Sequence, residues 1–251
     1  MAAKPTYVLV PGAWHTADCW TKVTEGLKSK GFLSTAVSLP STKSEPSATL
    51  LDDITATRQA IQAATSQGQN VVVVSHSYGG LVGASSIKGL DKPETPSSGR
   101  IIGFVVVTSG FSTTGMSFMD LFEGVPPPFW TPNKETGFAD LVTDTRTLFY
   151  HDIPVEEGEL WASKLTPHSL ESLYGGAEHA YAGWKDVPTA YIAATEDQAF
   201  PVLAQRMVVQ TAREQGKDVI FKELATSHSP FLSQPDEVVT FLVEVGEKFS
   251  L

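Results

Sequence analysis

Cysteine is nearly absent from this chain, because Cys19 is the only one among its 251 residues. A single thiol cannot form an internal disulfide or a thiolate cluster for zinc, which fits a reducing compartment. Basic residues are also few: 18 Lys and Arg stand against 28 Asp and Glu, giving a net charge of -10. This balance lacks the basic surface that nucleic acid or an anionic membrane requires, so we expect neither as a partner.

Several sequence patterns with a defined function are missing as well. No apolar run reaches the roughly 18 residues of a membrane-spanning helix, and the first residues lack the charged and apolar segments of a secretory signal. No histidine and carboxylate spacing indicates a metal site, and no Gly-x-Gly-x-x-Gly fingerprint indicates a nucleotide. We therefore expect a cytoplasmic protein that uses neither a metal nor an organic cofactor.

What the chain does contain is an alternation of short apolar runs with helix-compatible segments, which predicts an α/β fold with a parallel sheet. The apolar runs lie at Tyr7–Val10, Thr35–Leu39, Val71–Val74, Ile101–Thr108, Thr189–Ala194 and Val219–Leu224. Helices are expected around Trp20–Leu27 and at Thr49–Ala64, Leu81–Gly89, Val202–Glu214 and Asp236–Lys248. With 41% hydrophobic residues, the chain can bury one sizeable core, so we expect a single domain over residues 1–251.

The interval from about Phe111 to Asp186 interrupts this alternation. It contains a Pro-Pro-Pro run and half of the chain's Phe, Trp and Tyr residues, so we interpret it as an inserted lid. Any single aromatic there has a structural role as its simplest explanation, but the group as a whole indicates an apolar pocket. The residues expected to line this substrate pocket are Trp14, Phe111, Trp130, Phe149 and Trp161.

The four-valine run ends in a Ser-His-Ser-Tyr-Gly-Gly turn at residues 75–80, and the helix-like segment Leu81–Gly89 follows. In a nucleophile elbow, a serine occupies a strained strand-to-helix turn of this kind, and small residues flank it two positions away on each side. Ser77 has Ser75 and Gly79 at those positions, whereas the usual pattern has glycine at both. An ordinary Ser/Gly turn is the alternative, but the strand and helix on either side favour a nucleophile.

A serine hydroxyl becomes nucleophilic when a histidine removes its proton and a carboxylate orients that histidine. His228 follows the last strand and precedes the last helix, where an α/β sheet would place such a base. His76 adjoins Ser77 but should point away from it on a tight turn. The remaining candidates are His15 and the lid histidines His151, His168 and His179.

The orienting acid is expected in the loop after the strand at Thr189–Ala194, because such sheets place their sites at the carboxyl ends of strands. Asp197 is the better candidate and Glu196 the substitute, while a solvated loop acid is the plain alternative for either. Asp186 is interpreted as a turn residue.

Acyl transfer also needs donors for the oxyanion. The backbone amide of Tyr78 follows the nucleophile, and Gly12 allows a close turn after the first strand that leaves the amide of Ala13 as a second donor. An ordinary Pro-Gly turn is the alternative for this loop.

Together these motifs make the chain similar to α/β-hydrolase-fold serine hydrolases over its whole length. The loop Pro-Gly-Ala-Trp-His-Thr-Ala-Asp-Cys-Trp at residues 11–20 resembles the His-Gly-containing loop of the plant methylesterase and hydroxynitrile lyase group. The resemblance implies a mostly parallel six-stranded sheet with helices on both faces and an inserted helical lid at about 111–186. It also implies Ser77 as nucleophile, Asp197 as acid, His228 as base, and the amides of Ala13 and Tyr78 as the oxyanion hole.

Two positions depart from the plant lyases that cleave cyanohydrins. Those enzymes have a threonine in the first loop and a lysine directly after the histidine, where this chain has Gly12 and Ser229. Without the lysine, no charge is available to hold a leaving cyanide, so the resemblance favours ester hydrolysis.

The sequence therefore predicts a carboxylic ester hydrolase that acts on a small, mostly apolar or aromatic ester through an acyl-enzyme. Lactone opening and cleavage of a carbon-carbon bond in a β-diketone use the same triad and stay open as alternatives. A ligand receptor that kept the hydrolase scaffold is the third possibility.

Overall fold

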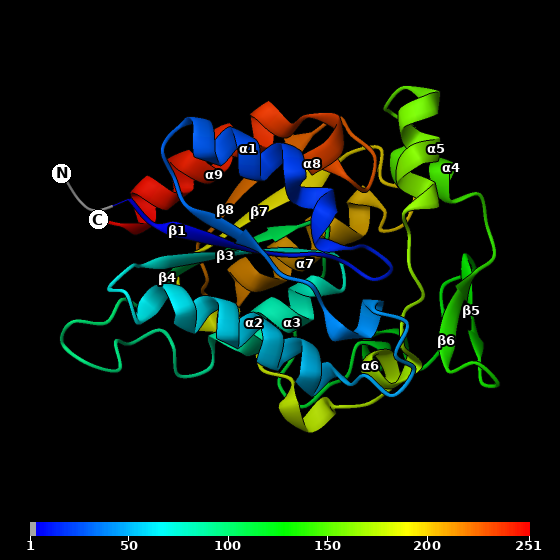
Figure 1. The fold of residues 1–251 in the computed structure, drawn as a ribbon, viewed down its shortest axis with the longest axis horizontal. Helices are drawn as coiled ribbons and strands as arrows, with labels where there is room; N and C mark the ends of the chain where they lie inside the picture. The colour runs from blue at the N-terminus through cyan, green and yellow to red at the C-terminus, as the bar shows by residue number, and fades with distance from the viewer. Residues whose placement is uncertain (1–3) are drawn as a thin grey trace.

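A computed structural model describes residues 4–251 and contains a central six-stranded sheet (Figure 1). The prediction that no secretory signal opens the chain falls partly on residues 1–3, which lie outside the described residues. The strands are β1 Thr6–Val10, β2 Ser34–Ala36, β3 Val71–His76, β4 Ile101–Val107, β7 Thr189–Ala194 and β8 Val219–Leu224. Their order is β2-β1-β3-β4-β7-β8, and every neighbouring pair is parallel, as the sequence predicts.

Strand β2 is shorter than the predicted run Thr35–Leu39. It lies at the edge of the sheet and pairs only with β1. Pairing ends soon after Val37, whose amide still donates to Leu9, because Pro40 has no amide hydrogen and begins a 3-10 turn. The inner strands are fully buried on both faces, which explains why the uninterrupted valines of β3 form a strand.

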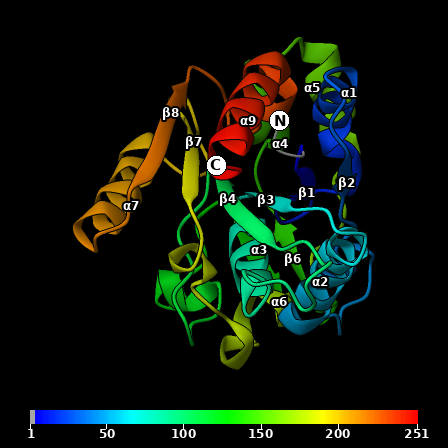
Figure 2. The same cartoon turned by 90° about the vertical axis from the view of Figure 1, so that its left-hand side faces the viewer.

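Helices cover both faces of the sheet (Figure 2). Helices α1 Thr21–Ser29 and α9 Pro235–Phe249 pack together on one face, and α2 Leu50–Thr65 and α3 Gly79–Ile87 pack together on the other. Helix α7 Val202–Glu214 packs against β7 and β8, and the short α8 Pro230–Ser233 precedes α9. Thr49 and Asp52 form a capping box that fixes the start of α2 where the sequence predicts it.

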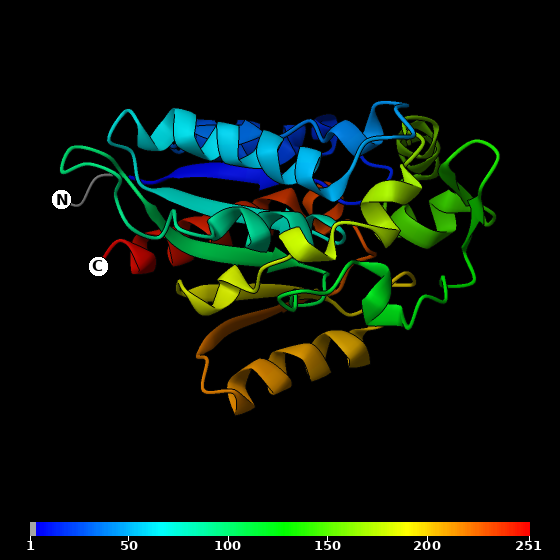
Figure 3. The ribbon, with the colours of Figure 1, turned by 90° about the horizontal axis from the view of Figure 1, so that it is seen from below.

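Most of the segment between β4 and β7 lies beyond the carboxyl ends of the strands, and its last part returns beside α3 to reach β7 (Figure 3). It contains α4 Thr145–Tyr150, α5 Val155–Ser163 and α6 Leu170–Tyr174, and also an antiparallel hairpin of β5 Trp130–Asn133 and β6 Phe138–Leu141. The resemblance implies a helical lid here, and the hairpin differs from that expectation. Its strands are short and Pro132 lies inside one of them, so the sequence carries no clear strand pattern. We refer to residues 111–186 as the insertion.

Short 3-10 turns complete the secondary structure: η1 Ala17–Trp20, η2 Pro40–Thr42, η3 Met119–Phe122, η4 Ala177–His179 and η5 Gly183–Lys185. Within residues 4–251, none of the helices combines the length and the apolar character needed to cross a bilayer.

Candidate active site

Ser77 lies at the sharp turn between β3 and α3. Its backbone φ is 51°, in the left-handed region that non-glycine residues rarely adopt. The Ser77 carbonyl accepts hydrogen bonds from the Gly80 amide at 2.8 Å and from the Ser109 hydroxyl at 2.5 Å, which fix the turn from two sides. This geometry is that of a nucleophile elbow, with the serine side chain directed away from the sheet.

Glycines allow the backbone to approach Ser77 closely. A Cβ on Gly79 would lie 2.4 Å from the Pro11 carbonyl oxygen, and one on Gly12 would lie 2.9 Å from the Ser77 Cβ. The loop after β1 therefore packs directly against the elbow. Ser75, which stands where the usual pattern has glycine, is fully buried, and its hydroxyl has no hydrogen-bond partner among the described residues.

His228 and Asp197 form a buried pair beside this turn. His228 Nδ1 lies 2.7 Å from Asp197 Oδ2, and both residues are less than a tenth exposed. The other carboxylate oxygen of Asp197 accepts the amides of Ala199 and Phe200, each at 2.8 Å. Because the carboxylate can only accept, Nδ1 carries a proton and the neutral ring keeps its Nε2 lone pair free to take another.

Glu196 does not take part in this pair. Its backbone carbonyl bonds the side chain of His151 in the insertion, and its carboxylate forms no hydrogen bond within residues 4–251. Asp197 therefore occupies the position that an orienting acid requires. Asp186 lies at the end of η5, before β7, whereas the loop of Asp197 follows β7.

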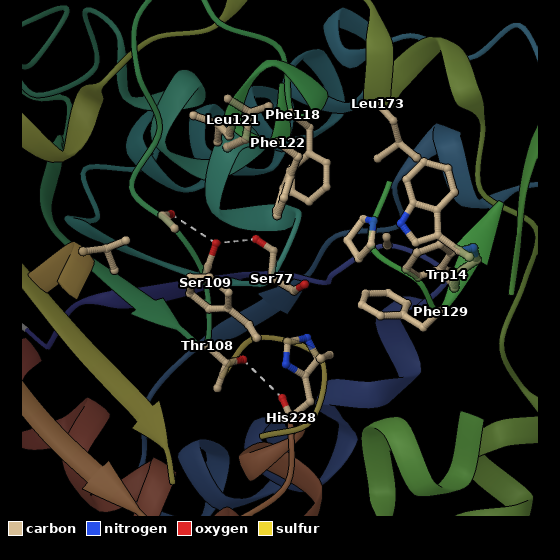
Figure 4. Close-up of a pocket in the computed structure, with 18 of the residues that line it drawn as sticks. Trp14, Ser77, Thr108, Ser109, Phe118, Leu121, Phe122, Phe129, Leu173 and His228 are labelled. Atoms are coloured by element: carbon tan, nitrogen blue, oxygen red, sulfur yellow. Dashed lines mark hydrogen bonds between the residues drawn. The ribbon is translucent and has the colours of Figure 1, made fainter. Parts of the chain in front are cut away.

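The Ser77 hydroxyl and the His228 ring line the same cavity (Figure 4). No hydrogen bond joins Ser77 Oγ to His228 Nε2 in the described part of the chain. Such contacts are often loose without substrate and tighten when it binds. The arrangement brings the hydroxyl, the imidazole and the carboxylate of the predicted triad to one edge of the sheet.

The two predicted oxyanion donors belong to the loop after β1 and to the elbow, which pack against each other. Neither the Ala13 amide nor the Tyr78 amide donates a hydrogen bond to another residue in the range 4–251, so both are available to a ligand. The Tyr78 hydroxyl is held away from the cavity, because it donates to Asp53 Oδ2 at 2.8 Å. Burial raises the pKa of that carboxyl group to about 6.

The carbonyl of His228 lies within hydrogen-bond distance of two side chains. The Thr108 hydroxyl donates to it at 3.2 Å, and His76 Nε2 lies 3.0 Å from it. His76 is thus directed toward the histidine loop, in agreement with the expectation that it points away from Ser77. Thr108 has a φ of 46°, an unusual conformation for a β-branched residue, at the point where β4 enters the cavity wall.

Three other buried histidines surround the site, and none is positioned as the base. Burial lowers the pKa of His15 to about 4 and that of His168 to about 3, and it lowers the pKa of His76 well below its usual value. These rings are therefore neutral at neutral pH and act as hydrogen-bonding groups. His168 Nδ1, for example, accepts the Trp14 amide at 3.5 Å.

The cavity has a volume of about 280 Å³ and a mostly apolar lining. Four of the five predicted aromatics line it, namely Trp14, Phe111, Trp130 and Phe149. The exception is Trp161, which lies on α5 outside the lining and has the Lys164 ammonium 4.3 Å from its ring centre. Trp161 is predicted to line the pocket only because it is aromatic. Aromatic character does not determine which face of the helix a residue lies on.

Several other lining residues are not among those predicted from the sequence. These include Phe118, Leu121, Phe122, Phe129, Leu173 and Phe200. Phe118, Leu121 and Phe122 follow helical spacing around η3, a signal that could have identified one wall. Phe200 could have been found from its place three residues after Asp197, in the acid's own loop.

Comparison with known proteins agrees with this fold. Residues 7–241 match the pattern of the Alpha/beta hydrolase family. The chain is 27% identical to Alpha/beta hydrolase nvfD of Aspergillus novofumigatus, over 95% of each chain, and 26% identical to Methylesterase 7 of Arabidopsis thaliana, over 97% of each. The crystal structure of polyneuridine aldehyde esterase has the same fold, with a TM-score of 0.77 and 24% identity over 97% of this chain and 99% of that one. This chain therefore belongs to the alpha/beta hydrolase family, and its similarity extends to a plant methylesterase.

Proposed function

We propose that this chain is a serine hydrolase of carboxylic esters. Ser77 Oγ attacks the ester carbonyl while His228 Nε2 takes its proton, and the amides of Ala13 and Tyr78 donate to the oxyanion. His228 then gives the proton to the departing alcohol, leaving an acyl group on Ser77. His228 Nε2 next takes a proton from a water molecule, which attacks the acyl carbonyl. The bond to Ser77 Oγ then breaks, Oγ takes the proton back from His228, and the acid is released.

One observation carries this proposal. His228 is bonded to Asp197 at 2.7 Å, and it shares a cavity wall with Ser77, whose left-handed backbone is that of an elbow. An orienting carboxylate beside the ring holds the tautomer that a base needs and stabilises the imidazolium that forms. The similarity to a methylesterase supports the ester as the substrate class.

The cavity favours a neutral substrate of modest size. Among the described residues that line it, none is Asp, Glu, Lys or Arg. A charged acyl group would lose its hydration without finding a partner, which is unfavourable. A volume of about 280 Å³ suits a single aromatic ring or a medium-length alkyl chain.

The test is a panel of neutral aryl esters, short- and long-chain alkyl esters, lactones and β-diketones, with product analysis. We expect turnover of neutral aryl or medium-chain esters, and labelling of Ser77 by a fluorophosphonate. The Ser77→Ala variant is the control and should lose both. Turnover of lactones or diketones without esters would replace the proposed reaction with that one. A folded protein that neither turns over any of these compounds nor reacts with the probe would instead be a receptor.

A further inference from the structure

Four consecutive residues of the insertion contact three different loops of the candidate site. The segment runs from Phe149 to Asp152, across the end of α4 and the turn that follows it. The three loops lie after β1, β7 and β8 and supply Ala13, Asp197 and His228. One short segment therefore connects the loops of the predicted oxyanion donor, acid and base.

The base loop donates two hydrogen bonds to this segment, both from Ser227, immediately before His228. The Ser227 amide donates to Asp152 Oδ2 at 2.8 Å, and the Ser227 hydroxyl donates to the Phe149 carbonyl at 2.8 Å. With the two donors to the His228 carbonyl described above, these bonds hold the backbone on both sides of the His228 Cα.

The acid loop receives one hydrogen bond. His151 Nε2 lies 2.9 Å from the carbonyl oxygen of Glu196, the residue before Asp197. Because a carbonyl can only accept, His151 donates from Nε2. The side chain of His151 thus fixes the peptide that leads into the orienting acid.

Tyr150 contacts the oxyanion loop through His15. The Tyr150 hydroxyl lies 2.8 Å from His15 Nε2, and His15 Nδ1 lies 2.7 Å from the Ala13 carbonyl. The His15 amide also donates to the Gly12 carbonyl at 3.3 Å. That carbonyl shares a peptide plane with the Ala13 amide, so orienting it orients the candidate oxyanion donor.

We propose that Tyr150, His151 and Asp152 are positioning residues that hold the oxyanion, acid and base loops at the separation that ester cleavage requires. This inference rests on the proposed function. None of the three side chains lines the cavity among the residues described, so each acts on substrate only through a loop. Their loss should therefore lower kcat and leave KM nearly unchanged, since small displacements of reacting groups cost much rate.

Two pairs of variants separate positioning from general damage. Asp152→Ala removes the acceptor for Ser227, whereas Asp152→Asn keeps an acceptor oxygen without the charge. His151→Ala removes the donor to Glu196, whereas His151→Gln keeps an amide donor of similar reach. We expect kcat to fall on the order of 10 to 100-fold in each alanine variant and to recover most of the way in each conservative one.

Asp144→Ala is the matched control on the same helix. Asp144 caps the start of α4, where its carboxylate accepts the Arg146 amide at 3.1 Å, and its hydrogen bonds within residues 4–251 all go to α4. This variant should lower Tm through the loss of the cap while kcat stays within about twofold of the wild type.

The outcomes distinguish this inference from the function on which it rests. A wild-type protein without esterase activity or fluorophosphonate labelling overturns the proposed function. An active wild type whose Asp152→Ala and His151→Ala variants keep full kcat overturns the positioning role. A fall in kcat for Asp144→Ala as large as for Asp152→Ala also overturns it, because helix stability would then account for the effect. If one alanine variant fails to fold, the other pair still decides the question.

Discussion

Ser75 and Gly83 fit against each other across the elbow: a Cβ on Gly83 would lie 2.0 Å from the Ser75 hydroxyl oxygen. Helix α3 therefore accommodates the serine that replaces the usual glycine by having a glycine of its own. Ser75, where the usual pattern has glycine, is therefore compensated by Gly83 within the same strand-turn-helix unit.

The Gly83→Ala variant should accordingly destabilise the fold. Alanine favours a helix over glycine, but overpacking a buried contact costs about 1–3 kcal/mol, more than the roughly 1 kcal/mol gained. Urea unfolding measures this difference. Adding Ser75→Gly to the variant should restore most of the lost free energy. A double variant as unstable as the single one would show that Ser75 is not the obstacle.

The two neighbouring carboxylates in the acid loop should have very different effects on turnover. Asp197→Asn leaves the packing intact but disturbs the tautomer of His228, so kcat should fall by about 10⁴-fold, as in other triads. Glu196→Gln should leave kcat nearly unchanged, because the Glu196 carboxylate forms no hydrogen bond within the described chain. Steady-state kinetics on one ester decide this, and similar losses in both variants would contradict the assignment of the acid.

Acid should destabilise the protein through its buried histidines. The pKa of His168 is lowered to about 3, so below about pH 6.5 the unfolded chain binds a proton that the folded chain does not. The contribution of neutral His168 to the free energy of unfolding is fully present above pH 6.5 and is lost as the pH falls toward 3. The free energy of unfolding should then fall by about 1.4 kcal/mol per pH unit from this residue.

His168→Asn keeps an acceptor for the Trp14 amide but cannot titrate. Its free energy of unfolding should depend less steeply on pH than that of the wild type between pH 6 and 4, as measured by urea unfolding. Asp53 changes stability in the opposite direction, because its pKa is raised to about 6, but its contribution is the same in both proteins and cancels. Equal slopes would show that His168 is charged in the folded state.

The preferred size of the acyl group should depend on the side chains of the cavity wall. Phe129 lines the cavity and is only partly buried, so Phe129→Ala enlarges the space with limited damage to the core. The ratio of kcat/KM for a bulky acyl ester to that for a small one should rise about tenfold or more. Trp161→Ala is the control, since this ring lies outside the lining, and it should leave the ratio unchanged. A change of equal size in both variants would contradict the cavity as the acyl site.

Much of the fold could be predicted because it depends on local patterns. The valines of β3 indicate a strand buried on both faces, and Thr49 marks the start of α2 within one residue. The hairpin of β5 and β6 could not, because Pro132 and several polar residues obscure a strand pattern that only tertiary contacts stabilise.

The reacting groups could likewise be proposed from the sequence, because Ser77, Asp197 and His228 each follow the end of a strand. Their supporting contacts could not. The bond between Tyr150 and His15 joins residues 135 positions apart. His168, which contacts the Trp14 amide, has no local feature that separates it from any other buried histidine. Such contacts depend on how the insertion folds back over the sheet.

Trp14 is attached to the insertion at three points: its indole nitrogen donates to the Ala139 carbonyl, its carbonyl accepts the Thr166 amide, and its amide contacts His168. An outward swing of the whole insertion would break all three bonds and carry the neighbouring Ala13 amide away from Ser77. Rotation of the half-buried rings of Phe118, Phe122 and Phe129 would break none of them. If substrate enters past these rings, the Ala13 amide stays beside Ser77 between turnovers. If the insertion opens like a hinge, the Trp14 hydrogen bonds and the position of the Ala13 amide must form again in each turnover.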